Sequence, residues 1–203
     1  RAKLPAPSTG AAPAVAGRES RDLSYYVGRY GNKGAQFVVD IPAQDVKLAP
    51  ERFQFRTTKS EAVFGEWRTD LAGDFLLWRD KSGQLYVIDG HHRLPLAQKA
   101  GAKIKGIVLD EAQVSARDAM GEGALRNIVT SPDVDPVDIA RMLKAWAPKG
   151  DVKEYLTAAG VGTTMQRTKL GVALAKLPDG AFDMVRAGEV DLPAAAAIAN
   201  ELS

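Results

Sequence analysis

The pentapeptide DGHHR, residues 89 to 93, gathers the side chains in this sequence best suited to bind or transform an anion. It contains both histidines of the 203-residue chain, together with an acid, a glycine and an arginine. Gly90 lets the backbone approach a ligand closely, and Arg93 offers a two-pronged donor that fits phosphate. His91 and His92 can donate further hydrogen bonds or act as acid or base, and Asp89 can hold a sugar hydroxyl, orient a histidine or take part in magnesium binding. These residue types predict a phosphate-binding site.

The elements on either side of the pentapeptide favour the same interpretation. Residues 85–88 have the pattern of a strand, and residues 94–100 that of a short helix ending at Gly101. The histidines and Arg93 then fall at a helix start, where unpaired N–H groups and the helix dipole attract anions. The residues alone leave a second interpretation open, in which Asp89 is a cap, Arg93 its ion-pair partner and the histidines polar surface. A zinc site is disfavoured, because adjacent histidines rarely face one metal.

The remaining pattern predicts the α+β class, with a small mixed-sheet domain followed by an all-helical domain. Two β-prone runs, 75–78 and 85–88, surround an Asp/Ser/Gly turn and indicate a hairpin, and further strands are expected at 36–39 and 104–109. Helices are expected at 111–129, 136–147, 152–159, 163–177, 180–187 and 193–202. We expect a disordered Ala/Pro-rich linker at 1–22, a sheet domain at 23–130 and a helical domain at 131–203.

Composition excludes several classes of protein. The chain has no cysteine, so it has no disulfide, thiolate metal site or cysteine nucleophile. No apolar run approaches the roughly 18 to 20 residues of a membrane span, so we expect a soluble, cytoplasmic protein without a membrane partner. The net charge of +2 does not by itself indicate nucleic-acid binding. Because the chain starts with Arg1 rather than Met, we expect it to be a piece of a longer polypeptide with other domains.

Four stretches resemble, in the same order, those of ParB-type chromosome and plasmid partition proteins. The stretch from Gly90 to Ala97, closing at Ala100-Gly101, is similar to the family's Gly-Glu-Arg-Arg-x-x-Ala box. The others are Ile41 to Val46 with Phe53 to Arg56, Ala124 to Ala140, and Leu177 to Ala197. The resemblance covers roughly residues 36 to 202. The DGHHR form is closest to divergent members of the ParB/sulfiredoxin superfold found in phages and mobile elements.

The resemblance implies a nucleoside di- or triphosphate, CTP or ATP, bound with Mg²⁺. The residues that would bind the nucleotide are Gln54, Arg56, Gly90, His91, His92, Arg93 and Asn127, with Asn127 also near the metal. His91 stands where sulfiredoxins have their catalytic cysteine, which excludes their chemistry. The second box of the family keeps Asn127 but has Arg126 in place of its glutamate, which puts nucleotide hydrolysis in doubt.

The segment from Asp151 to Leu177 has the proportions of a helix-turn-helix, with a turn at Gly160 and a second helix capped by Thr163 or Thr164. The residues expected to contact DNA, near the start of that second helix, are Thr164, Gln166, Arg167 and Lys169. An all-helical support domain with solvated basic residues is the alternative.

The leading hypothesis is a ParB-like DNA-binding protein that holds a nucleotide at DGHHR and acts in DNA partition, maintenance or transfer. The second hypothesis is an enzyme, either a metal-dependent nuclease or a kinase, with Asp89, His91 and His92 as catalytic residues. The third is a segment of a multidomain protein with neither activity. DNA and a nucleotide are the expected partners, and the sequence leaves open a homodimer.

Overall fold

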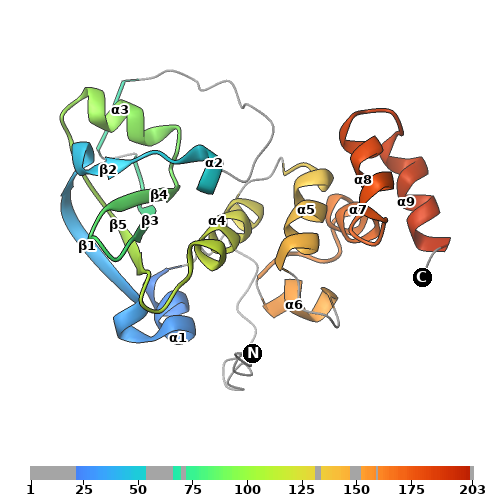
Figure 1. The fold of residues 1–203 in the computed structure, drawn as a ribbon, viewed down its shortest axis with the longest axis horizontal. Helices are drawn as coiled ribbons and strands as arrows, with labels where there is room; N and C mark the ends of the chain where they lie inside the picture. Colours follow the sequence, from blue (N-terminus) through green and yellow to red (C-terminus); the bar gives the residue numbers. More distant parts are fainter. Residues whose placement is uncertain are drawn as a thin grey trace.

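The computed structural model describes residues 22–53, 66–69, 72–130, 134–146, 152–158 and 160–201. Figure 1 shows a sheet with its helices, coloured blue to green, and a group of helices coloured yellow to red. The helix α4 (Ala116–Thr130) lies between these two parts. The α+β class is therefore confirmed, whereas the domain boundaries at 22 and 130 stay predictions.

The described residues form one five-stranded mixed sheet with the order β1-β5-β3-β4-β2. Its strands are β1 (Ala35–Pro42), β2 (Val46–Lys47), β3 (Phe75–Arg79), β4 (Leu85–Asp89) and β5 (Lys103–Asp110). The predicted hairpin is confirmed, since β3 and β4 pair antiparallel with Leu77 opposite Val87. β3 also pairs parallel to β5. As a result the first residues of β5 and β3 and the last residues of β4 lie at the same end of the sheet.

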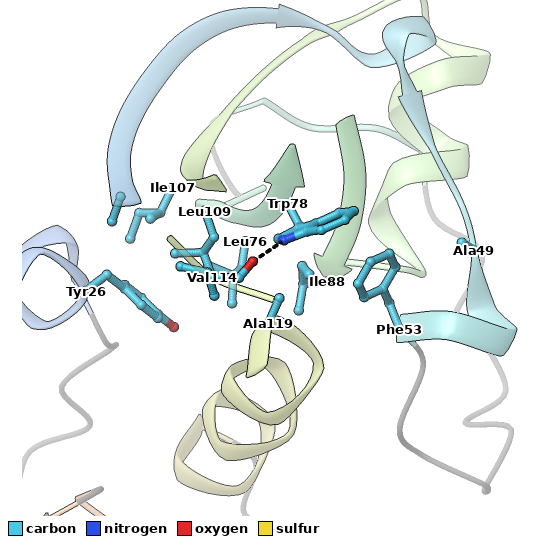
Figure 2. Packing of buried hydrophobic residues seen from close by; sticks show 11 residues of the cluster. Tyr26, Ala49, Phe53, Leu76, Trp78, Ile88, Ile107, Leu109, Val114 and Ala119 are labelled. Carbon is cyan, nitrogen blue, oxygen red and sulfur yellow. Dashed lines mark hydrogen bonds between the residues drawn. The ribbon is translucent and has the colours of Figure 1, made fainter. Parts of the chain in front are cut away.

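Helices cover both faces of the sheet, and the alternation of side chains along the strands supplies a core on each face. On one face lie α1 (Leu23–Gly34), α2 (Pro50–Phe53) and the first turns of α4, packed around Trp78. Figure 2 shows this core, in which the indole N–H of Trp78 donates to the carbonyl of Val114 over 2.8 Å. On the other face, α3 (Arg93–Lys99) and the 3-10 turn η1 (Ala43–Asp45) pack against Phe75 and Leu77. β3 is buried on both sides, which explains its unbroken apolar sequence.

The second half of the chain is helical. Its helices are α5 (Pro136–Trp146), α6 (Val152–Ala158), α7 (Gln166–Leu174), α8 (Asp179–Arg186) and α9 (Leu192–Glu201). The predicted start at Asp135-Pro136 is confirmed, since the Asp135 carboxylate accepts the N–H of Val137 over 2.8 Å. Leu125 and Ile128 of α4 belong to the core formed with α5 and α6, so α4 contributes to the cores of both parts.

Several predicted boundaries were wrong for identifiable reasons. The helix expected from 111 begins at Ala116, because Ser115 caps it by accepting the N–H of Asp118 over 3.1 Å. α1 was not predicted: its glycines obscure the helical spacing of Tyr26 and Tyr30, and the helix is kinked at Gly31. None of the helices in the described part of the chain is long and apolar enough to cross a membrane.

Candidate functional site

The DGHHR segment forms the corner between β4 and α3. Asp89 is the last residue of β4, and Gly90 has a φ of 112°, a left-handed conformation that disfavours any other residue. A methyl group on Gly90 would also lie 2.5 Å from the ring of Phe75. The carbonyl of Gly90 accepts the N–H groups of Arg93 and Leu94, both over 2.9 Å, and so starts α3. Gly90 is therefore required by the turn and by the packing of Phe75.

The carboxylate of Asp89 lies between two arginines that come from different helices. Its Oδ2 is 3.2 Å from Nε of Arg126 on α4 and 3.7 Å from Nη2 of Arg93 on α3. We call Asp89, Arg93 and Arg126 the Asp89 cluster. Two guanidinium groups thus face one carboxylate, and the charge of Asp74 also acts on Arg93.

The Arg93 guanidinium is also bound to the chain just before β3. It donates to the carbonyls of Ala72 and Asp74, and its Cζ lies 4.5 Å above the centre of the Phe75 ring. Burial lowers the pKa of Arg93, opposed by the charge of Asp89, but an arginine stays protonated at any physiological pH. The sequence left open an alternative interpretation in which Arg93 is the ion-pair partner of Asp89. The structure contains this ion pair.

Arg126 was not predicted as a site residue, although it belongs to the cluster. α4 approaches β4 closely at Gly123, where a methyl group would lie 2.5 Å from Cγ2 of Ile88. One turn later Arg126 reaches Asp89 and donates to the Asp74 carbonyl over 3.1 Å, and its side chain is only 8% exposed. The available signal was a charged residue placed between Ala124-Leu125 and Ile128-Val129 of a helical stretch, which favours a buried and paired side chain.

The two histidines have different surroundings. His92 is exposed and occupies the N-cap position of α3 without a side-chain capping bond. His91 is half-buried, and its Nε2 is buried with no hydrogen-bond partner within the described structure. Burial lowers the pKa of His91, with Asp89 acting in the opposite direction. A buried ring nitrogen without a partner is unusual and has a ligand as one explanation.

Comparison with solved structures identifies the fold. C-terminally truncated ParB from Caulobacter crescentus, complexed to the centromeric parS site, matches 81% of this chain and 84% of its own, with a TM-score of 0.51 and 19% identity. The chain has a ParB-like fold. The C-terminally truncated Caulobacter ParB complexed with CTP-gamma-S matches 82% of this chain and 92% of its own, with a TM-score of 0.29 and 17% identity.

Sequence comparisons add little to the ParB-like fold. No family model matches the chain. A curated aspartate–tRNA(Asp/Asn) ligase from Thermus thermophilus is 32% identical over 101 residues, which is 48% of this chain and 23% of the ligase. The match thus spans less than a quarter of the ligase and assigns no family. The predicted ParB resemblance is confirmed for the fold, and the divergent phage and mobile-element subtype stays a prediction.

In this ParB-like fold, the remaining predicted nucleotide and metal residues are only partly placed. Gln54 and Arg56 lie outside the described residues. Asn127 is one turn after Gly123 on α4 and donates to the Gly123 carbonyl over 3.0 Å, so it shares the side of the helix that approaches β4. The described ranges contain no group of three or more His, Asp and Glu side chains able to hold a metal. Magnesium near Asn127 therefore stays a prediction.

The four residues that the sequence predicted to contact DNA lie in the first turn of α7 or just before it. Thr164, Gln166 and Lys169 are exposed, and Arg167 is half-buried with Nη2 3.3 Å from Sδ of Met165. The predicted cap was wrong: α7 begins at Gln166, and Met165 occupies the N-cap position without a side-chain capping bond.

The opposite side of α7 is packed against the helical core. Thr168 is buried, and a methyl group on Gly171 would lie 2.6 Å from Ile139 of α5. Neighbouring residues of one short helix thus divide into a buried side and an exposed polar side.

Proposed function

We propose that this protein binds DNA as a ParB-like partition or maintenance protein, with the first turn of α7 as the contacting element. The observation that carries the proposal is the division of α7. Gln166 and Lys169, three residues apart on one side of the helix, are exposed, while Thr168 and Gly171 anchor the other side to α5. The solved structure with a TM-score of 0.51 is a ParB complexed to its parS site, which supports the same function for this fold.

The side chains available on α7 match the chemistry of a DNA groove. Gln166 carries the amide that pairs with an adenine edge, whereas Lys169 and Arg167 carry charges for phosphates. The hydroxyl of Thr164, just before the helix, is a further donor to phosphate oxygens. In this proposal α6 and α7 act as a helix-turn-helix, with α7 as the helix that enters the groove.

The test is duplex DNA binding by Arg167→Ala/Lys169→Ala, measured by fluorescence anisotropy across salt concentrations. We expect weaker binding and a salt dependence flatter by about 2 in log–log slope, because each lost phosphate contact removes roughly 0.9. Lys47→Ala/Lys81→Ala removes the same charge from exposed positions on the sheet half and serves as the matched control. Equal behaviour of the two double variants would overturn the assignment to α7.

We also propose that the Asp89 cluster binds the phosphates of a nucleotide, CTP or ATP with Mg²⁺, next to His91. The two neighbouring guanidinium groups and the unpaired Nε2 of His91 support the proposal, since each can donate to a phosphate oxygen. In this structure the carboxylate of Asp89 forms ion pairs with both arginines. A bound phosphate would therefore compete with Asp89 for the two arginines.

This second proposal is tested by calorimetric titration with CTP, ATP and ADP, each with magnesium. We expect Arg93→Ala to abolish binding and Asp89→Asn to strengthen it, because the asparagine removes the competing charge. Unchanged binding by Arg93→Ala, or weaker binding by Asp89→Asn, would contradict the competition model.

A further inference from the structure

A small pocket next to the Asp89 cluster opens at the end of the sheet where β5 and β3 begin, and two of its lining residues, Ala72 and Phe75, contact Arg93. It has a volume of about 160 Å³ and apolar walls made by Val39, Trp67, Ala72, Gly73, Phe75 and Ile104. Asp40, Thr69, Lys103 and Lys105 complete its lining. Sites for drug-sized ligands are typically about 300 to 1,000 Å³, so this pocket fits one planar ring rather than an extended molecule.

The aromatic wall of the pocket is held in place from behind. The rings of Trp67 and Phe75 have centroids 6.4 Å apart and planes inclined by 35°. The indole N–H of Trp67 donates to Oγ1 of Thr69 over 3.0 Å, and the guanidinium of Arg93 lies on the Phe75 ring. Because its hydrogen bond is satisfied within the chain, the indole presents to the pocket a surface suited to stacking.

The rim of the pocket carries two lysines, each of which is paired with a carboxylate. Lys103 and Lys105 lie two positions apart on β5 and therefore on the same face of the strand, opposite the bulge of β1 at Asp40. Their ammonium groups are 4.0 Å from the carboxylate of Asp40 and 3.6 Å from that of Asp74, yet the side chains remain 66% and 57% exposed. Such exposed ion pairs are weak, so an incoming anion can replace the carboxylates.

We propose that this pocket binds one nucleotide unit, with the base stacked on Trp67 and its phosphate on Lys103 and Lys105. A stacking surface beside basic residues is the combination by which proteins bind single-stranded nucleic acid without sequence preference. The same chemistry is offered by a free nucleoside monophosphate and by one residue of a single strand. The site is distinct from the duplex contact at α7, and it adjoins the Asp89 cluster at Phe75.

The experiment uses the whole chain, thymidine monophosphate and a labelled oligothymidylate. Of the three tryptophans, Trp67 lines the pocket, Trp78 is fully buried and Trp146 ends α5 outside the pocket lining. Base stacking should therefore quench the emission of Trp67, and Trp67→Phe should remove the quenching. In anisotropy titrations, we expect Lys103→Gln/Lys105→Gln to weaken binding of the strand about tenfold or more, with a flatter salt dependence. Lys47→Gln/Lys81→Gln is the matched control, since these exposed lysines lie on β2 and beyond the far end of β3.

Each outcome separates this site from the proposed function. Binding of both ligands, lost in Lys103→Gln/Lys105→Gln but kept in Arg167→Ala/Lys169→Ala, supports a strand-binding site. Binding of the monophosphate alone, with the same mutational pattern, supports a site for a free nucleotide. The inference is overturned if neither ligand binds, or if binding is lost only in Arg167→Ala/Lys169→Ala. Duplex DNA binding by Lys103→Gln/Lys105→Gln tests the contact at α7 independently.

Discussion

The guanidinium of Arg126 closes over the carboxylate of Asp89, with Nε 3.2 Å from Oδ2, and so ties α4 to the end of β4. The arginine is 8% exposed and the aspartate 22%, so both charges have given up much of their hydration. A charge in such a place is stable only while its partner is present. Since α4 also contributes to the core of the helical half, the pair fixes the site relative to that half.

Removing one member of this pair should destabilise the fold more than removing both. We expect Arg126→Met to lower the free energy of unfolding by about 2 kcal/mol, because Asp89 keeps only the more distant Arg93 and the Asp74 carbonyl loses a donor. Asp89→Asn should also destabilise, because it leaves Arg126 buried without a full counter-charge. Urea denaturation of both single variants and the double variant gives the coupling energy, and additive effects would contradict a direct interaction.

Gly90→Ala should destabilise through two causes that a control can separate. The positive φ costs any alanine about 1 kcal/mol or more, and the methyl group would in addition overlap the ring of Phe75. Gly83 also has a positive φ, 88°, but a methyl group added there would have nothing within 4 Å. We therefore expect Gly83→Ala to lose only the conformational part. Equal losses of unfolding free energy for the two variants would show that Phe75 moves aside without cost.

His91 should make the protein less stable as the pH falls. Its pKa is lowered in the folded chain from the usual 6.5, mainly by burial, so the unfolded chain binds the proton more readily. The free energy of unfolding should fall as the pH drops through 6.5 towards the folded pKa, by at most about 1.4 kcal/mol per pH unit. Below the folded pKa this contribution becomes constant.

The check is thermal or urea unfolding at several pH values for the wild type and His91→Asn, with His92→Gln as the control at an exposed position. The pKa of Asp110 is lowered from 3.8 by a backbone hydrogen bond from Ala112 and by Arg79, so this acid titrates in a separate, lower window. A pH dependence unchanged in His91→Asn would assign the effect to other groups.

The sequence predicted the elements of the site better than their interactions. The β3–β4 hairpin and the start of α5 follow from local signals, namely two apolar β-prone runs around a turn and an aspartate before a proline. Arg126 could not be assigned to Asp89, since that contact depends on how closely α4 approaches β4 at Gly123. The pocket lined by Trp67 and Lys105 likewise joins segments that only the sheet order brings together.

The packing of α7 on α5 gives a final prediction about the DNA-contacting surface. Gly171→Ala should lower the free energy of unfolding by about 1 to 3 kcal/mol, because its methyl group would lie 2.6 Å from Ile139 and 3.0 Å from the Pro136 carbonyl. Gly180→Ala makes the same change in α8, where nothing lies within 4 Å, and should stabilise by up to about 1 kcal/mol through helix propensity. Urea denaturation measures both.

If α7 contacts DNA, Gly171→Ala should also weaken duplex binding under conditions where the chain is still folded, because the helix is pushed away from α5. Gly180→Ala should leave duplex binding unchanged. Weakened binding in both variants, or in neither, would show that the position of α7 does not determine DNA affinity.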